Sequence, residues 1–204
     1  MKYLLGEKLK FDWKIVTVTV VSTLLLTVDY YQKIFASKYT DRIVLYLVIP
    51  LLVIFLVFRE NPKEYGFSFG DWKLGLTYTA IGILIMAPVI YFLGHGNASM
   101  KSYYERFLNG LPWTTFLDLF GWEFFFRGWI LFTYARKFGL EALWLHAVPF
   151  ALGHLGKPEI ETLSTIFGGF AFGWVAWRTK SFFYAFLIHW FIGTFVIIVA
   201  AGVI

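Results

Sequence analysis

The feature that most constrains this chain is its uncharged C-terminal stretch. Ser181–Ile204 contains no Asp, Glu, Lys or Arg, and the same holds for Leu74–Gly94. A helix needs roughly 20 mainly apolar residues to cross the hydrocarbon core of a bilayer. Inside lipid the backbone must satisfy its own hydrogen bonds, which favours helices for such stretches. The sequence therefore predicts a helical membrane protein.

The composition of the whole chain supports this interpretation. Of its 204 residues, 59% are hydrophobic and 15% are charged, whereas soluble domains average about 45–50% apolar and about 25% charged residues. Aromatic residues make up 22%, which suits lipid contact and interfacial belts. The chain has no cysteine, which excludes a disulfide framework, a thiolate metal site and a cysteine nucleophile.

Seven apolar segments are long enough, or nearly so, to cross a membrane. We expect an all-α polytopic transmembrane helix bundle of about seven to eight helices, the eighth being an interfacial N-terminal stretch. Residues 1–204 should form a single integral membrane domain, in which helices four to seven enclose a polar intramembrane cavity. Pro149 should kink the fifth segment or free backbone carbonyls there. The segments cover about residues 11–31, 43–58, 74–94, 112–135, 141–156, 160–177 and 181–204.

The distribution of basic residues predicts the orientation of the bundle. With the N-terminus in the cytoplasm, 11 Lys and Arg residues lie on the cytoplasmic side and 6 on the other, while Arg127 lies within a span. Basic residues concentrate in cytoplasmic loops, so we predict a multi-pass protein of a prokaryotic cytoplasmic membrane with a cytoplasmic N-terminus. The net charge of +5 is explained by anionic lipid headgroups, and no nucleic acid partner is predicted.

Ionisable side chains inside spans are costly and are functional candidates by default. The fourth segment carries three of them, Asp118, Glu123 and Arg127. Glu123 and Arg127 are four residues apart, so they share a helix face and can form an ion pair. Asp118 shares a face with Trp122 instead. A Glu–Arg pair can also serve only to hold helices together, so this pair alone does not predict a site.

Histidines in the fifth and seventh segments add to this set. At a rise of about 1.5 Å per residue, His154 and His189 reach the same central layer as Glu123 and Arg127, whereas His146 is shallower. His146 therefore has a structural explanation, a hydrogen bond to a nearby carbonyl. Two further features have a structural explanation. Glu159 and Glu161 favour a helix N-terminus, and the Gly168-Gly169 pair with the Gly169–Gly173 spacing is typical of a close-packing surface.

A carboxylate and an imidazole side by side can activate a water molecule. The carboxylate takes a proton while the imidazole orients or shares it, and a second imidazole directed at a carbonyl oxygen could stabilise the oxyanion. Glu123, His154 and His189 supply these groups, and Arg127 would help to hold the carboxylate ionised. This combination indicates hydrolysis of a peptide bond inside a membrane. Transporters also place Glu, Arg and His at mid-bilayer, but the sequence shows no matching halves with broken helices.

The same residues resemble the CPBP family, the CAAX proteases and bacteriocin-processing proteins also called Abi or type II CAAX prenyl endopeptidase-like proteins. The signature of that family is three motifs on separate membrane helices, EExxxR, FxxxH and HxxxN/D. Residues 123–128 match the latter part of the first motif, Phe150 to His154 match the second, and His189 opens the third. The resemblance covers about residues 105–204, which we expect to be the motif-bearing core.

The resemblance implies a helical intramembrane protease. In that family the first-motif Glu and second-motif His activate water, and the third-motif His with its Asn or Asp partner holds the oxyanion. A glutamate mechanism without metal or other cofactor suits these residues best, because the sequence has no HExxH motif. The alternative to a metal-free mechanism is a weak zinc site at Glu123, His154 and His189. The implied partners are a membrane-associated peptide or protein substrate and the bilayer; the sequence makes no prediction of oligomeric state.

Two positions depart from the family pattern. Trp122 stands where the first Glu of EExxxR is usual, and Gly193 stands where Asn or Asp usually follows the third-motif His. Glu123 would then take the role of base, or Asp118 would substitute. The predicted function is an intramembrane endopeptidase acting on membrane-associated or CAAX-like peptides. The alternative is a non-catalytic relative that binds membrane peptides or serves in immunity or as a scaffold. The predicted site comprises catalytic Glu123, His154 and His189, with Arg127, Phe150 and Asp118 in support.

Overall fold

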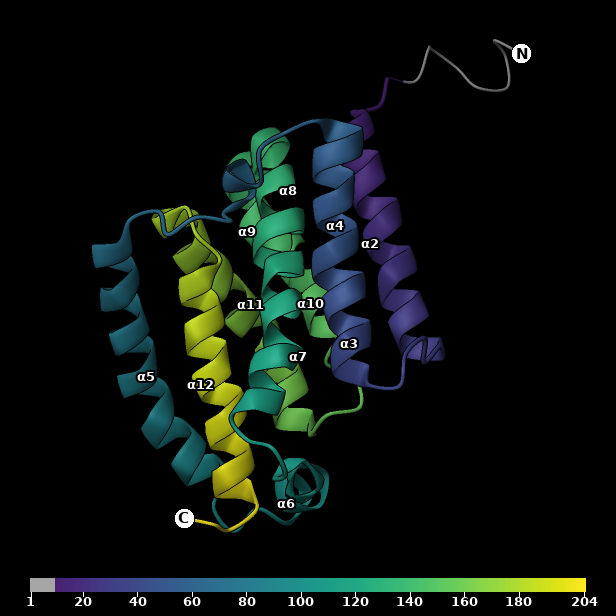
Figure 1. The fold of residues 1–204 in the computed structure, drawn as a ribbon. Helices are drawn as coiled ribbons and strands as arrows, with labels where there is room; N and C mark the ends of the chain where they lie inside the picture. Colours follow the sequence, from purple (N-terminus) through teal and green to yellow (C-terminus); the bar gives the residue numbers. More distant parts are fainter. Residues whose placement is uncertain (1–9) are drawn as a thin grey trace, which may run out of the picture.

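The computed structural model describes residues 10–204. Within that range the chain is all-helical and contains no β-strand, which agrees with the predicted fold class. The helices form a bundle with the start of α2 at one end and the C-terminus at the other (Figure 1). The predicted interfacial N-terminal stretch lies mostly outside the described residues.

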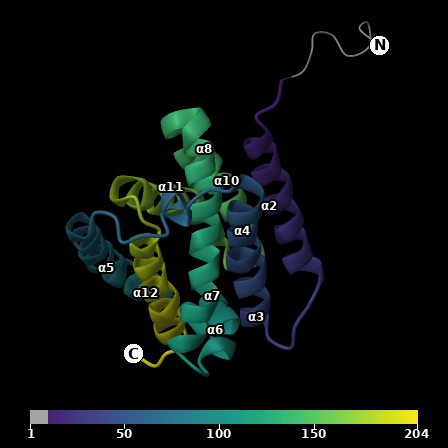
Figure 2. The same ribbon diagram turned by 45° about the horizontal axis from the view of Figure 1, so that its top comes forward.

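The first two rods of the bundle lie side by side (Figures 1 and 2). Helix α2 (Trp13–Tyr31) begins at Asp12, whose side chain accepts hydrogen bonds from two backbone amides of the first turn. The second rod is continuous and alternates between α and π geometry: α3 (Lys38–Ile43), η1 (Val44–Val48), α4 (Ile49–Leu52) and η2 (Val53–Phe58). It starts five residues earlier than predicted, because Ser37 provides an N-cap. Arg42 therefore lies within the helix rather than at its boundary.

A polar loop leads to the third rod. The short 3-10 helix η3 (Pro62–Tyr65) is capped by Asn61 and ends at Gly66 with φ 72°, as the turn residues of the sequence indicate. Helix α5 (Trp72–Gly94) is capped by Asp71 and is followed by two short elements, α6 (Ala98–Tyr104) and η4 (Glu105–Phe107).

The motif-bearing rod runs through the centre of the bundle (Figure 2). It consists of α7 (Trp113–Glu123), the π-helical η5 (Phe124–Ile130) and α8 (Leu131–Phe138). Every residue from Gly121 to Thr133 is buried, and its aromatic side chains form the main hydrophobic cluster. Because this rod is surrounded by others, its polar groups face protein rather than lipid. π-helical segments inside α-helices are frequent at functional sites, and η5 begins directly after Glu123.

The predicted fifth span is wrong in its length and continuity. After η6 (Gly139–Glu141), the chain forms α9 (Ala142–Leu145) and α10 (Ala147–Leu152), with a turn at His146. Together these two helices rise only about 16 Å at roughly 1.5 Å per residue. The break lies close before Pro149, which lacks the amide that would bond the carbonyl four residues earlier. His154 therefore lies in a turn after α10 rather than within a helix.

The last two rods close the bundle. They are α11 (Glu159–Thr179) and α12 (Phe183–Ala200), and α12 lies between α5 and the central rod (Figure 1). A Cβ atom on Gly169 would come within 2.9 Å of the Ala147 Cβ atom, and one on Gly173 within 2.3 Å of His146. The predicted close packing is confirmed for Gly169 and Gly173, whose contacts hold α11 against α9 and α10, but it is wrong for Gly168, where a Cβ would meet no atom within 4 Å.

Four helices of the described chain are long and apolar enough to cross a membrane, namely Trp13–Tyr31, Lys38–Phe58, Trp72–Gly94 and Phe183–Ala200. Large apolar side chains on the outer surface of α5, such as Leu84 at 73% and Phe92 at 79% exposure, are suited to contact with lipid tails. The total of seven to eight spans stays a prediction.

Candidate active site

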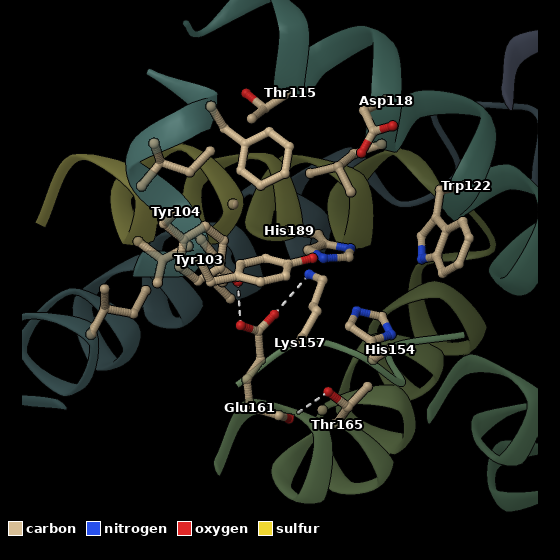
Figure 3. A pocket seen from close by; sticks show the side chains of 18 of the residues that line it. Tyr103, Tyr104, Thr115, Asp118, Trp122, His154, Lys157, Glu161, Thr165 and His189 are labelled. Atoms are coloured by element: carbon tan, nitrogen blue, oxygen red, sulfur yellow. Dashed lines mark hydrogen bonds and ion pairs between the residues drawn. The ribbon is translucent and has the colours of Figure 1, made fainter. Parts of the chain in front are cut away.

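A cavity of about 720 Å³ lies among α3, α5, α6, α7, α11, α12 and the turn after α10. Several residues singled out in the sequence line it, among them Asp118, Trp122, His154 and His189 (Figure 3). Phe150, Glu161 and Gly193 also line it. Much of the remaining wall consists of apolar side chains from α5 and α12. The cavity is thus amphipathic rather than wholly polar.

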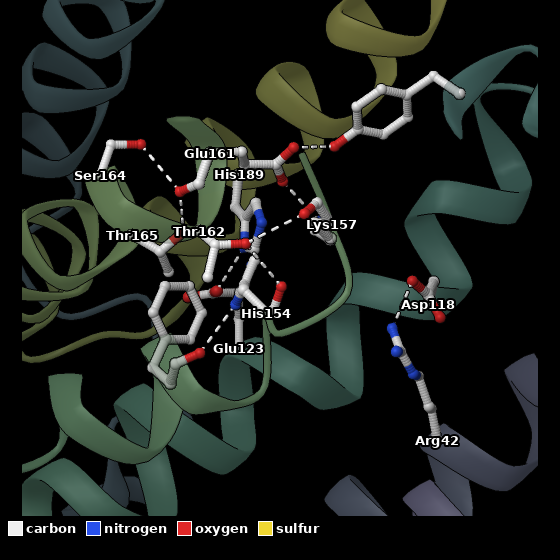
Figure 4. A network of polar contacts seen from close by, with 12 residues as sticks. Arg42, Asp118, Glu123, His154, Lys157, Glu161, Thr162, Ser164, Thr165 and His189 are labelled. Carbon is white, nitrogen blue, oxygen red and sulfur yellow. Dashed lines mark hydrogen bonds and ion pairs between the residues drawn. The ribbon is translucent and has the colours of Figure 1, made fainter. Parts of the chain in front are cut away.

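Three buried polar side chains, Glu123, Arg127 and His189, lie at or beside the cavity. The Glu123 Oε1 atom is 2.6 Å from His189 Nδ1 and 3.2 Å from Arg127 Nη1. Glu123 and Arg127 are fully buried and His189 nearly so. The predicted Glu123–Arg127 pair is therefore present, and the two motif helices meet through the Glu123–His189 hydrogen bond (Figure 4).

Glu123 and His189 differ in their access to the cavity. His189 lines the cavity, whereas Glu123 and Arg127 do not. Because the Glu123 carboxylate is ion-paired and can only accept, His189 Nδ1 carries the hydrogen of their bond. In the neutral form of this imidazole, the Nε2 atom has a lone pair and can accept a hydrogen bond. Glu123 thus acts on the cavity through His189, an arrangement that the sequence did not indicate.

Phe150 makes two separate contacts that explain its place in the second motif. The Arg127 Cζ atom lies 3.7 Å from the centroid of the Phe150 ring and 5.1 Å from that of Phe172. A desolvated cation–π contact of this kind is worth about 2 kcal/mol. The Phe150 carbonyl oxygen is 2.8 Å from His154 Nδ1. Since a carbonyl only accepts, His154 Nδ1 carries the hydrogen and its Nε2 remains an acceptor.

The two histidines face each other across a short distance. The ring centroids of His154 and His189 lie 6.2 Å apart with an interplanar angle of 25°, and Phe172 stacks on His189 with the centroids 5.2 Å apart. Two imidazoles are therefore held side by side at the cavity. A site of this kind can accept two hydrogen bonds from one small donor such as water.

Asp118 lies on the cavity side of α7 with Trp122, as the helical spacing indicates. Its carboxylate is occupied by a cation that the sequence did not connect with it. Arg42 Nη1 donates to Asp118 Oδ2 at 2.6 Å, and Arg42 Nε lies 3.7 Å from Asp29 Oδ2. The sequence gives no signal that joins these groups, because Arg42 falls just outside the predicted span 43–58.

Trp122 and Gly193, the two departures from the family pattern, both line the cavity. The Trp122 side chain is 4% exposed, and its ring lies 5.8 Å from that of His154, centroid to centroid. A Cβ atom on Gly153 would come within 2.8 Å of the indole, and one on Gly193 within 3.0 Å of Leu119. The glycine at position 153 therefore leaves the room that the Trp122 ring occupies.

Residues 105–195 match the family model of the type II CAAX prenyl endopeptidases called Rce1-like. This match confirms the predicted resemblance. No curated protein and no solved structure matched the chain. The Rce1-like family consists of CAAX-type intramembrane proteases, and this chain is similar to them over residues 105–195. The match and the four apolar helices together support an integral membrane protein.

The Rce1-like segment contributes most of the polar side chains that line the cavity. Glu161 accepts hydrogen bonds from Lys157 Nζ at 2.7 Å and from the Tyr104 hydroxyl (Figures 3 and 4). Burial and the Glu161 carboxylate raise the pKa of Tyr104, which keeps its hydroxyl a donor. The sequence explained Glu161 only as a helix N-terminal charge; its spacing of four from Lys157 was the available signal.

The remaining residues of interest in the Rce1-like segment have structural surroundings. His146 is fully buried, bonds the Ala142 carbonyl at 2.9 Å through Nδ1 and does not line the cavity. Across residues 10–204, no three His, Asp or Glu side chains lie close enough together to hold a metal ion. A mechanism without metal stays a prediction.

Proposed function

We propose that this protein is an intramembrane endopeptidase that hydrolyses peptide bonds of membrane-associated or CAAX-like peptides. The observation that carries the proposal is the 2.6 Å hydrogen bond between Glu123 and His189 beside a cavity that His154 also lines. The cavity volume of about 720 Å³ is in the range of substrate pockets. Its apolar walls suit a peptide with apolar side chains.

In the proposed mechanism, a water molecule binds between the two imidazoles. His189 Nε2 accepts one proton of that water as general base, and His154 Nε2 accepts a hydrogen bond from the other O–H group, which orients the oxygen. The water oxygen attacks the carbonyl carbon of the scissile peptide bond. Glu123 stabilises the imidazolium that forms on His189, while Arg127 neutralises the carboxylate in the resting site.

The second half of the reaction returns the proton. The tetrahedral intermediate collapses and the C–N bond breaks, while His189 donates its Nε2 proton to the leaving nitrogen. The products are a carboxylic acid, which ionises, and an amine. Phe150 supports both stages because its carbonyl fixes the tautomer of His154 and its ring covers Arg127. Asp118 supports the site by holding Arg42 at the cavity, and the mechanism requires no cofactor.

We further propose that the N-terminus is cytoplasmic, in a prokaryotic cytoplasmic membrane. The charge count supports this orientation, because the spans predicted from the sequence assign 11 basic residues to the cytoplasmic side and 6 to the opposite side. The charged residues that line the cavity belong to the end of the bundle that carries α6 (Figure 1). In this orientation the cavity opens away from the cytoplasm, and one membrane domain contains the whole site.

A second candidate function is binding of a membrane peptide without cleavage. One observation favours it: the position usual for the family's first catalytic Glu is Trp122, and the nearby Asp118 carboxylate is bound by Arg42. A relative with this site could act in immunity or as a scaffold.

Turnover of a membrane-peptide library by the purified protein distinguishes the two functions. The wild type should cleave members of the library, and His154→Ala should lose at least about 100-fold in kcat, as expected when a general acid–base partner is removed. His95→Ala, an exposed histidine outside the cavity, is the matched control and should cleave normally. Binding of library peptides by the wild type without any cleavage would support the second function instead.

A further inference from the structure

We infer that the indole N–H of Trp122 is the hydrogen-bond donor that holds the carbonyl oxygen of the bound peptide. The inference rests on the proposed function and assigns a role to a position where the chain departs from its family. The Trp122 N–H is buried and unpaired, it points towards the two imidazoles, and neighbouring side chains hold the ring in place.

The first observation is that the Trp122 Nε1 atom is buried and has no hydrogen-bond partner. Among the described residues it is the only buried indole nitrogen in that state. Two other tryptophans do have partners: Trp129 donates to Ser22 at 2.9 Å, and Trp190 donates to the Pro112 carbonyl at 2.9 Å. Leaving a buried donor unpaired is unfavourable. A ligand atom that accepts this hydrogen bond would therefore add to the binding free energy of the ligand.

The second observation is the direction of this donor. Trp122 lines the cavity, and its indole nitrogen lies on the side of the ring that faces His154 and His189 (Figure 3). A group that accepts its hydrogen bond would therefore occupy the cavity beside the two imidazoles. Because an indole nitrogen only donates, the ligand atom must be an acceptor. In a peptide, the carbonyl oxygen is the acceptor present at every bond.

The third observation is that the Trp122 ring is held in place from several sides. The Arg42 guanidinium lies over the ring at 4.8 Å, and Tyr46 packs against the ring edge-to-face at 5.3 Å. Phe126 packs against it at 4.9 Å, and position 153 is a glycine, where a Cβ would clash with the indole. A donor that is already oriented needs little reorganisation when the reaction begins, which is the condition for effective stabilisation of an oxyanion.

These observations assign complementary roles within the cavity. Water held by His154 and His189 attacks the carbonyl carbon, while the oxygen of that carbonyl accepts from Trp122 Nε1–H. As the tetrahedral intermediate forms, the C=O double bond becomes a single bond and the oxygen takes a full negative charge. The hydrogen bond strengthens at that stage, and the nearby Arg42 cation adds to the stabilisation. A carboxylate at position 122 could accept a proton but could not donate this bond when ionised.

The test replaces the N–H while keeping an aromatic ring. Trp122→Phe should lower kcat by about 10²–10³-fold, the usual effect of removing one oxyanion donor, with little change in KM. Trp129→Phe is the matched control, because it removes an indole N–H that bonds Ser22 away from the cavity; its kcat should stay within a few-fold of the wild type. Equal kcat for Trp122→Phe and the wild type would overturn the inference.

A second measurement separates this inference from the proposed function. In protein labelled with ¹⁵N-tryptophan, the indole signal missing from Trp122→Phe belongs to Trp122. Adding a library peptide should shift that signal downfield, since its hydrogen gains an acceptor, and leave the Trp129 signal in place. If the wild type does not cleave but the signal shifts, the endopeptidase proposal fails and Trp122 still binds a peptide carbonyl. An unshifted signal at saturating peptide contradicts the inference whether or not cleavage occurs.

Discussion

Glu123 and His189 are separated by 66 residues in the sequence, yet their side chains share a 2.6 Å hydrogen bond in the interior of the bundle. Only the histidine lines the cavity. In the proposed mechanism the two groups have different roles. The buried Glu123 carboxylate stabilises positive charge on His189, and the His189 imidazole is the group at the cavity that accepts the proton.

Replacement of Glu123 by Gln should impair both catalysis and stability. The amide cannot compensate an imidazolium on His189, so we expect kcat to fall by about 10²–10⁴-fold. Arg127 would also lose its partner inside the protein, which should cost about 3–5 kcal/mol of unfolding free energy. Turnover measured at matched folded fraction, together with unfolding in detergent, tests both expectations.

Asp118→Asn is the control for that experiment. It removes a carboxylate that is bound to Arg42 rather than to a histidine, so cleavage should fall much less than in Glu123→Gln. Cleavage that survives in Glu123→Gln but is lost in Asp118→Asn would make Asp118 the functional carboxylate. Cleavage that survives in both variants would remove carboxylate chemistry on this helix from the mechanism.

Adjacent glycines in α11 should respond in opposite ways to substitution by alanine. A Cβ on Gly169 would meet the Ala147 Cβ atom at 2.9 Å, whereas one on Gly168 would meet no atom within 4 Å. Overpacking should make Gly169→Ala less stable by about 1–3 kcal/mol. Gly168→Ala should be neutral or more stable by up to about 1 kcal/mol, because alanine favours the helix. Thermal unfolding of both variants checks this; equal melting temperatures would disprove the packing contact.

The polar loop after η2 should make stability depend on pH in the acid range. Lys14 Nζ lies 2.5 Å from Glu60 Oε1, and Arg136 Nη1 lies 2.9 Å from both carboxylate oxygens. Burial alone would raise the pKa of Glu60, but these hydrogen bonds, with one from the Tyr65 hydroxyl, lower it from 4.5 to about 2. The folded state binds the proton of Glu60 less tightly than the unfolded state does. The ionised carboxylate therefore adds to the free energy of unfolding in full above about pH 4.5, and this stabilisation is lost as the pH falls towards 2.

Glu60→Gln provides the comparison. The variant lacks the titrating group, so its unfolding free energy should fall less steeply between pH 4.5 and 2 than that of the wild type. The unfolding free energies of the variant and the wild type should therefore differ most near neutral pH and least near pH 2. Parallel pH profiles would show that Glu60 does not contribute through its ionisation.

The proposed orientation can be tested with single cysteines, because the chain has none of its own. Ser99 in α6 and Leu140 in η6 are exposed positions at opposite ends of the bundle. A maleimide that does not cross membranes should label Ser99→Cys in intact cells and should reach Leu140→Cys only after permeabilisation. The reverse pattern would place the N-terminus and Leu140 outside and make the cavity open to the cytoplasm.

Much of the architecture could be predicted from the sequence because its signals are local. Uncharged apolar runs such as Leu74–Gly94 must form helices in lipid, and capping residues such as Asp71 mark where they begin. Prediction failed where the backbone depends on contacts between elements. The fifth segment forms two short helices, α9 and α10, that pack against the glycines of α11, a contact that composition does not reveal.

The same division holds for the site. The sequence by itself placed Glu123 and Arg127 on one helix face, put Asp118 with Trp122 on another, and selected His154 and His189 by their depth, because helical periodicity and rise are fixed by the backbone. Only the tertiary structure decided that Glu123 reaches the cavity through His189, that Arg42 neutralises Asp118, and that the Trp122 N–H is left without a partner. These outcomes depend on which side chains meet across helices, and that is set by packing among distant segments rather than by spacing along one of them.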